Sequence, residues 1–291
     1  MDMSGKWQIL GNPSPEDLTE ARLQLHWAVQ LIASVGTTYL DPRPDDSHPN
    51  MGWDRASQSL AGHVVTAQES FQAALRPADL TLFLRDGQGN EVSHLALDGA
   101  SLEEGSTWLS TAIDSHIGDE ARPLVPAGYE IPAHAVGEGG NFSLNDAAAF
   151  EELSRWFANA DLVLTAMADP YGTPVRCWPH HFDIGSWISL ATDSDAENAP
   201  SIGMGMTPGD DSYPVPYWYL SPYALPDERP SLPALPEGAH WHTEGWMGAV
   251  LTAPVIAAQA TSEGQLRVVS QYLDSAWNAA RAMLGQEKTG E

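Results

Sequence analysis

The chain has few positive charges and almost no cysteine. Its 291 residues include thirteen Lys and Arg against thirty-nine Asp and Glu, a formal net charge of −26. Such an acidic surface repels polyanions, so we expect no binding to nucleic acid or to an anionic membrane. Cys177 is the sole cysteine, which excludes an intramolecular disulfide and a zinc site made of several thiolates.

Long apolar runs are also missing. The longest, residues 248–258, is shorter than the roughly 20 residues of a membrane span and contains Pro254. The first residues show no apolar run flanked by basic residues, so we expect no signal peptide. These absences predict a soluble, cytoplasmic protein, and nothing in the pattern specifies an oligomeric state.

Helical periodicity begins near the N-terminus. Ser14 is placed to cap a helix with Pro15 at its first position, and Gly36 is placed to end it. His26 falls one step off the apolar stripe, which predicts a surface or boundary histidine.

The remaining elements follow from turn, cap and alternation signals. A glycine turn at 87–90 between alternating segments predicts a β-hairpin. Capping-box spacing at Ser101/Glu104 and at Ser262/Gln265 predicts two helix starts. The elements expected besides the first helix are the hairpin of 80–86 and 91–98, helices over 101–113, from 146 and over about 262–284, and strands at 175–178, 181–190, 201–206, 215–222 and 240–246 with its apolar continuation.

This order favours an α+β fold with a mostly antiparallel sheet flanked by helices. The chain divides into an N-terminal half, 1–125, and a C-terminal half, 126–291, near a Pro- and Gly-rich stretch at 118–145. The halves share the order of their elements and a short echo, PDDSHP (44–49) and GDDSYP (209–214). A duplication and a single compact domain are both open alternatives.

Two segments carry side chains suited to metal binding. If 181–190 is a strand, His181 and Asp183 share one face, while His180 lies on the other. The same alternation places His240, His242 and Glu244 on one face of a second strand. Imidazole and carboxylate groups suit a divalent transition metal, so a site of His181, Asp183, His240, His242 and Glu244 is one hypothesis. Neither the cupin spacing nor H-E-x-x-H is present, and such pairs are also common on solvent-facing strands.

A ligand pocket is the second possibility. Pro214 and Pro216 favour extended backbone, which puts Tyr217 and Tyr219 on one face. Aromatic rings with polar tips form pocket walls, and nearby carboxylates provide polar anchors. The residues predicted to bind such a ligand are His180, His181, Asp183, Asp210, Asp211, Tyr217 and Tyr219. The alternative is an edge strand whose aromatic residues cover the core.

The segments WPHHFDIGSW, SIGMGMTPGDDSYPVPYWYLSPY and HWHTEGWMGAVL, together with LHWAVQ and DDSHPNMGW, resemble a family of uncharacterised bacterial proteins, a domain of unknown function. The resemblance covers most of the chain. It implies a shared fold and no particular reaction, so it assigns no catalytic residue.

Three hypotheses of function follow. The first is a protein that binds a small polar ligand in a cleft lined by His, Asp and aromatic residues. The second is a metal-dependent enzyme, a hydrolase or an oxygenase, with Glu244 as general base or further ligand. The third is an interaction or structural module without chemistry.

Overall fold

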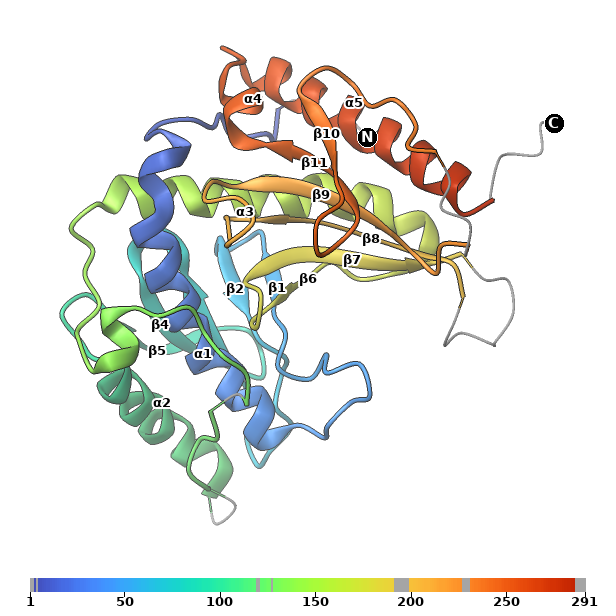
Figure 1. Ribbon diagram of the computed structural model, residues 1–291. Coiled ribbons are helices and arrows are strands. Elements are labelled where there is room, and N and C mark those ends of the chain that lie inside the picture. Colours follow the sequence, from blue (N-terminus) through green and yellow to red (C-terminus); the bar gives the residue numbers. More distant parts are fainter. Residues whose placement is uncertain are drawn as a thin grey trace. The chain divides into compact units, whose positions relative to one another are not determined.

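The computed structural model describes residues 3, 5–118, 121–126, 128–190, 199–226 and 231–285. It confirms the α+β class, with helices and two antiparallel sheets (Figure 1). The chain forms two compact units: unit 1 comprises Met1–Gly11, Asn159–Val175 and Ile184–Glu291, and unit 2 comprises Asn12–Ala158 and Arg176–Asp183. The boundary predicted after residue 125 lies inside unit 2, and the duplication stays a prediction.

Unit 2 contains an antiparallel sheet in the order β1-β2-β3-β4-β5. Its elements are η1 (Pro15–Leu18), α1 (Thr19–Tyr39), β1 (Gly52–Asp54), β2 (Ser59–Ala61), β3 (Phe71–Arg76), η2 (Pro77–Asp79), β4 (Thr81–Asp86), β5 (Glu91–Ala96), α2 (Leu102–Ile117), η4 (Ala135–Glu138), the first part of α3 (Ala147–Ala168) and β6 (Arg176–Trp178). Helices α1 and α2 contact each other and the central strands β3 and β4.

Two local predictions are confirmed in unit 2. Strands β4 and β5 form the expected hairpin, and the Asp86 carboxylate accepts the N–H groups of Gln88 and Asn90 in its turn. Helix α2 begins with the expected capping box, since the Ser101 hydroxyl accepts from Glu104 N–H while the Glu104 carboxylate accepts from Ser101 N–H.

The predicted end of the first helix is wrong. Helix α1 continues three residues beyond Gly36 to Tyr39. A Cβ atom at Gly36 would lie 2.6 Å from His48 O and 2.8 Å from Pro49 Cα. Glycine is therefore needed there because the following loop packs closely on the helix, and it does not end the helix.

The Pro- and Gly-rich stretch at 118–145 lies along α1 in its described parts. Tyr129 OH donates to Gln30 Oε1 over 2.8 Å, and Trp27 Nε1 donates to Pro132 O over 3.0 Å. Side chains of the helix thus satisfy polar groups of a segment that has little regular structure of its own.

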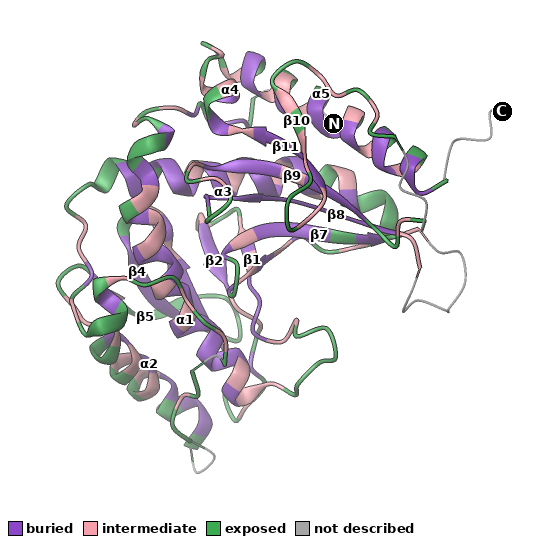
Figure 2. Cartoon of the chain, in the orientation of Figure 1, coloured by how far each residue is buried: buried purple, intermediate pink, exposed green. Residues whose placement is uncertain are grey.

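Unit 1 contains the second sheet, in which the strands of this unit follow the order β10-β11-β9-β8-β7. Its elements are the second part of α3, η5 (Asp169–Tyr171), β7 (Asp183–Ser189, from its second residue), β8 (Ser201–Thr207), β9 (Tyr217–Tyr223), β10 (Ala239–His242), β11 (Gly248–Thr252), α4 (Ala253–Ala257) and α5 (Ser262–Met283). Helix α5 packs on β9 and β11. Strand β8 is buried over its whole length (Figure 2).

Two predictions for unit 1 need correction. The segment at 240–246 is not one strand: β10 ends at His242, and a turn leads into β11. The N-cap of α5 is Thr261, whose side chain accepts from Gly264 N–H, and not Ser262. Gln265 lies in the core, so it takes no part in a capping box.

Among the helices in the described part of the chain, none combines the length and the apolar character needed to cross a bilayer.

Candidate functional site

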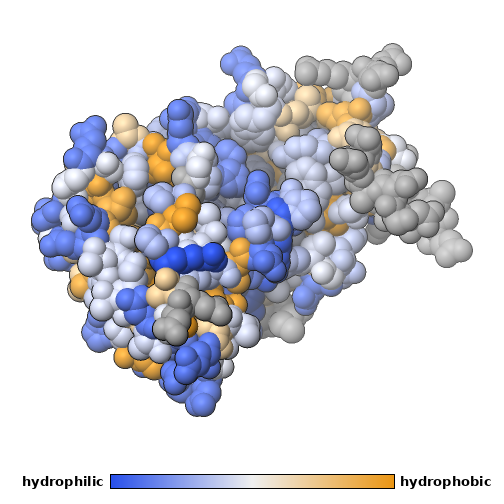
Figure 3. All heavy atoms as spheres, turned by 90° about the horizontal axis from the view of Figure 1, so that it is seen from below, coloured by the Kyte–Doolittle hydropathy of each residue, from blue (hydrophilic) through white to orange (hydrophobic). Residues whose placement is uncertain are grey.

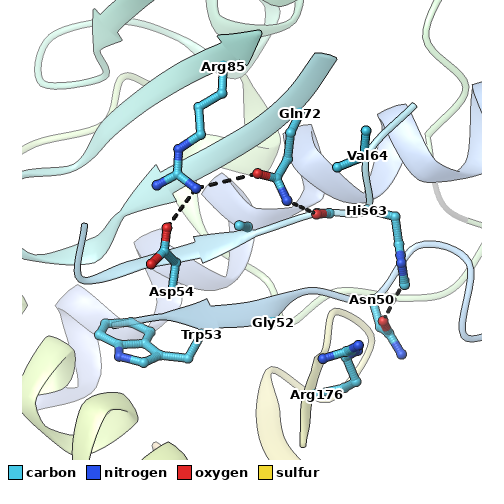
Figure 4. A pocket seen from close by; sticks show the side chains of 11 residues that line it. Asn50, Gly52, Trp53, Asp54, His63, Val64, Gln72, Arg85 and Arg176 are labelled. Atoms are coloured by element: carbon cyan, nitrogen blue, oxygen red, sulfur yellow. Dashed lines mark hydrogen bonds and ion pairs between the residues drawn. The ribbon is translucent and has the colours of Figure 1, made fainter. Parts of the chain in front are cut away.

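A cavity of about 380 Å³ lies in unit 2, on the face of its sheet that carries Gln72 and Arg85 (Figure 4). Alternation along the strands sends the buried Leu60, Leu75 and Leu84 to the opposite face. The cavity is lined by Asn50, Gly52, Trp53, Asp54, Ala61, Gly62, His63, Val64, Gln72, Arg85 and Arg176.

Arg85 forms the centre of a hydrogen-bonded network in the cavity wall. It is only 9% exposed, and its Nη1 lies 2.6 Å from Asp54 Oδ2 and 3.4 Å from Gln72 Oε1. Its Nη2 donates to Ser57 Oγ. Gln72 sits directly opposite Arg85 in the pairing of β3 with β4 and donates to Gly62 O over 2.7 Å. Each of these polar groups is bonded to the next one, so the position of the Arg85 guanidinium is fixed before any ligand binds.

The ionised form of Asp54 is stabilised within this network. Burial opposes ionisation, but the N–H of Ala56 and the side chains of Arg85 and Ser57 lower the pKa of Asp54 overall. The pair therefore stays charged at neutral pH.

A histidine in a defined tautomer also lines the cavity. His63 Nε2 lies 2.9 Å from Asn50 Oδ1 and 3.1 Å from Ser47 O. A backbone carbonyl can only accept, so Nε2 carries the proton and Nδ1 is the acceptor. Burial lowers the pKa of His63, and the charges of Arg176 and Arg43 lower it further. At neutral pH the imidazole is therefore uncharged.

The lining of the cavity is rich in basic groups although the chain is acidic. Two arginines, Arg85 and Arg176, line it together with one carboxylate, that of Asp54. Charges farther away than about 8–10 Å are largely screened at physiological ionic strength, so this local balance matters more than the net charge of −26. Guanidinium groups bind carboxylate and phosphate through paired hydrogen bonds, which makes the cavity suited to an anion.

The sequence interpretation missed these lining residues because it did not include β3. The segment FQAALR is rich in helix-forming Ala, Leu and Arg, yet it pairs with β2 and β4 as a strand. Without that pairing, nothing in the sequence places Gln72 next to Arg85. The one available signal was the presence of an arginine inside the apolar strand LTLFLRD.

The strand predicted over 181–190 begins in the structure at Asp183, two residues later than predicted. Residues 179–182 form a turn in which Phe182 has φ +55° and donates its N–H to Trp178 O. The separation of His180 and His181 to opposite strand faces is therefore wrong. Their rings lie 4.3 Å apart between centroids, and both residues are exposed.

The placement of His26 at the surface is also wrong. His26 is 6% exposed, its ring stacks on Phe182 at 5.3 Å, and its Nε2 donates to Pro179 O over 3.0 Å. The turn at 179–182 covers this face of α1, which helical periodicity alone could not show.

This buried histidine predicts acid sensitivity. Burial lowers the pKa of His26 to about 4, and nearby Arg22, His181 and His180 add to the effect. The unfolded chain, with an ordinary pKa near 6.5, takes up the proton first, so the contribution of His26 to stability falls as pH drops from about 6.5 towards 4. By urea unfolding at pH 7 and pH 5, we expect wild type to lose about 2 kcal/mol more than His26→Gln, which keeps a donor for Pro179 O. Equal losses in both proteins would contradict the assignment.

Cys177 is a packing residue. It is fully buried, and burial followed by the charge of Asp183 raises the pKa of its thiol well above the ordinary value. A thiol in this environment stays protonated, which disfavours a nucleophile.

A second group of predicted residues meets in unit 1. The Asp210 carboxylate accepts the N–H groups of Ser212 and Tyr213 through Oδ1, and the hydroxyl of Tyr217 over 2.6 Å through Oδ2. Asp211 is exposed. Asp210 therefore organises the loop before β9 and ties it to the first residue of that strand.

Tyr219 packs across the sheet of unit 1 on glycines. It pairs with Gly205 of β8, and its hydroxyl also lies against Gly185 of β7. An aromatic ring over glycines restores packing that they lack, which is a known stabilising arrangement in sheets.

His240 and His242 share one face of β10, and both contact the hydroxyl of Tyr213. Glu244 is outside the strand, and its backbone oxygen accepts from His242 Nε2 over 2.6 Å. The prediction that Glu244 continues the strand face is therefore wrong.

Within the part of the chain that the structure describes, no group of three or more His, Cys, Asp or Glu side chains is placed to hold a metal ion. His181 and Asp183 belong to unit 2, whereas His240, His242 and Glu244 belong to unit 1. The metal-dependent hydrolase or oxygenase that would use all five stays a prediction.

The surface drawn in Figure 3 bears on the interaction hypothesis. Hydrophobic residues appear there in small groups among hydrophilic ones. The large hydrophobic residues with substantial exposure come from many separate elements: Ile9, Val64, Val92, Val125, Tyr171, Trp187, Tyr223 and Leu232. Trp187 and Tyr223 form an exposed aromatic pair, with 4.1 Å between their ring centroids, whereas single exposed hydrophobic residues are ordinary for a protein surface.

The fold and the cavity together define an α+β protein with two antiparallel sheets and a polar, arginine-lined pocket on one of them. No family model matches the chain, and no curated protein and no solved structure matches it. The resemblance to uncharacterised bacterial proteins stays a prediction.

Proposed function

We propose that the protein binds a small anionic ligand, one that carries a carboxylate or a phosphate group, in the pocket of unit 2. The observation that carries this proposal is the pair of arginines, Arg85 and Arg176, on a cavity in a chain with only thirteen basic residues. Arg85 is held by Asp54 in the cavity wall, and Arg176 adds a second guanidinium to the lining.

The remaining lining groups suit the rest of such a ligand. His63 and the buried Asn50 add ring and amide groups to the lining, and Gln72 adds an amide that also accepts from Arg85. Trp53 adds an apolar surface. A pocket with a few convergent polar groups and an apolar wall is typical of small-molecule sites.

The test is a calorimetric titration of the protein with succinate and with inorganic phosphate. We expect one of these anions to bind wild type, and Arg176→Gln to weaken it about 10- to 100-fold, because a hydrogen bond to a charged group contributes about 1.5–3 kcal/mol.

Arg55→Gln is the matched control, since it makes the same charge change at an exposed position next to Asp54 but outside the lining. We expect its affinity to stay within about twofold of wild type, as for an exposed charge. Equal weakening by both variants, or no binding of either anion by wild type, would reject the proposal.

A further inference from the structure

Three side chains of unit 1 converge on a single point. The Tyr213 hydroxyl oxygen lies 2.8 Å from His240 Nε2 and 3.0 Å from His242 Nδ1. The two histidines are two positions apart on β10, which is the edge strand of its sheet. Both imidazoles therefore project from one face of a strand that, among the described residues, pairs only with β11.

The hydrogen bonds of His242 define its tautomer. Its Nε2 lies 2.6 Å from the backbone oxygen of Glu244, which can only accept, so Nε2 carries the proton. Nδ1 then holds a lone pair directed at Tyr213, and the Tyr213 hydroxyl donates to it. Since that hydroxyl has only one proton, His240 Nε2 must donate to the phenol oxygen.

His242 has the surroundings of a metal ligand. Metal-binding histidines usually donate their second ring N–H to a backbone carbonyl or a carboxylate, which fixes the ring and its tautomer. Here Glu244 O takes that role, and the Trp246 ring stacks on the imidazole at 4.3 Å and 22°. The lone pair of Nδ1 is therefore held in a fixed direction.

The two distances from the Tyr213 hydroxyl oxygen to the histidine nitrogens are short enough for each nitrogen and the oxygen to bind one ion. With metal–ligand bonds of about 2.0 Å, two ligands at 90° lie about 2.8 Å apart, whereas two ligands of a tetrahedron lie about 3.3 Å apart. The observed 2.8 Å equals the first value, and 3.0 Å lies between the two and nearer the first. Tetragonal coordination by N and O atoms is typical of Cu(II) and Ni(II).

We propose that His240 Nε2, His242 Nδ1 and the phenolate oxygen of Tyr213 bind one divalent transition-metal ion, with Cu(II) preferred. The third ligand is a phenol oxygen and not a third histidine or a carboxylate. This site belongs to unit 1 and is independent of the anion pocket of unit 2.

Binding has a defined proton balance. The Tyr213 phenol loses its proton to solvent as the oxygen–metal bond forms. Neutral His240 keeps one proton but carries it on Nδ1 in place of Nε2. His242 is already in the tautomer that binds. One proton is released for each ion bound, and the nearby carboxylate of Asp210, which accepts the N–H of Tyr213, favours the cation.

The test is a titration of chelator-treated protein with copper(II) sulfate, followed by visible absorption and electron paramagnetic resonance, with glycine as competitor. We expect one Cu(II) per chain with a phenolate-to-copper charge-transfer band. Tyr213→Phe should abolish the band and weaken binding at least about tenfold, and His240→Ala should weaken it similarly. The affinity should be highest for Cu(II). The difference in affinity between Cu(II) and either Ni(II) or Zn(II) should be larger than the difference between Ni(II) and Zn(II).

Two controls keep the result decisive. Tyr223→Phe removes an exposed tyrosine of the same sheet and should leave the band unchanged. His240 is exposed, so His240→Ala tests the site even if Tyr213→Phe fails to fold, as judged by circular dichroism. A charge-transfer band that persists in Tyr213→Phe, or copper affinity in His240→Ala equal to that of wild type, would overturn the proposal.

Discussion

Replacing Gln265 by leucine is expected to lower the free energy of unfolding by about 4 kcal/mol, through the loss of several buried hydrogen bonds at once. Gln265 is fully buried in unit 1. Its Oε1 accepts from Leu10 N over 2.8 Å and from Trp7 Nε1 over 3.2 Å, and its Nε2 donates to Leu10 O over 2.8 Å and to Gln259 O over 3.2 Å. The amide therefore completes the hydrogen bonding of the N-terminal segment as a neighbouring strand would.

The expected size follows from the groups left behind. Leucine has a similar volume and can neither donate nor accept. Both backbone groups of Leu10 and the indole N–H of Trp7 then stay buried without these bonds, at about 1–3 kcal/mol each. The added apolar contact of leucine offsets part of that cost.

The matched control is Gln271→Leu, the same chemical change at an exposed position of the same helix. It should shift the urea midpoint only slightly. Hydrogen exchange gives a local measure, because the amide of Leu10 should lose protection in Gln265→Leu but not in Gln271→Leu. An unchanged midpoint together with unchanged protection of Leu10 would show that the amide does not hold the segment.

Elements with signals in adjacent residues could be predicted from the sequence. The hairpin of β4 and β5 follows from alternation around a glycine turn, and the start of α2 follows from the spacing of Ser101 and Glu104. In both cases the partners that stabilise the structure lie within a few positions of each other, so the physics is local.

Two failed predictions, the surface position of His26 and the separation of His180 from His181, depend on a turn that has no typical turn residue. Phe182 takes a left-handed conformation at φ +55°, which bulky residues rarely adopt. Burial of its ring against His26 and Phe157 stabilises that conformation. No property of the segment WPHHFD itself indicates this contact, because one partner lies some 150 positions earlier in the chain.

The echo between the halves has a structural counterpart. In PDDSHP, Asp45 Oδ1 accepts from Ser47 N–H, and in GDDSYP, Asp210 Oδ1 accepts from Ser212 N–H. Each is a turn in which an aspartate side chain binds the backbone two residues on. The shared motif thus specifies a local turn, and the duplication itself stays a prediction.

The residues of the anion pocket are brought together by the register of strand pairing and not by a local sequence motif. Arg85 and Gln72 come together because they are directly paired across β3 and β4, and Asp54 joins them from β1. Strand pairing of this kind is long-range information that composition and spacing do not contain. Because the same pairing holds these charged and polar side chains together, substitutions among them are expected to change the free energy of unfolding strongly.

Asp54→Asn is accordingly expected to lower the free energy of unfolding by about 3 kcal/mol, because it leaves the Arg85 cation without its counter-charge. Breaking a buried ion pair from one side costs about 3–5 kcal/mol, and the Asp54 side chain is 29% exposed, so the low end applies. The amide retains an oxygen for the N–H of Ala56, which confines the change mainly to charge. The same variant should also perturb anion binding, since Arg85 loses the partner that positions it.

Asp79→Asn provides the comparison, because it breaks an Arg–Asp pair of unit 2 in which the Asp79 side chain is 53% exposed. We expect a loss of less than about 1 kcal/mol there, as for other surface pairs. Adding Arg85→Met to Asp54→Asn should restore most of the stability, because removing both charges avoids an uncompensated cation. Urea unfolding of wild type, Asp54→Asn, Arg85→Met and the double variant measures the coupling energy between the two side chains, and Asp79→Asn is measured beside them. If Asp54→Asn and Asp79→Asn lost the same stability, the Arg85 guanidinium would have to be solvated in the folded protein, and the pocket could not be the preorganised site that its hydrogen bonds describe.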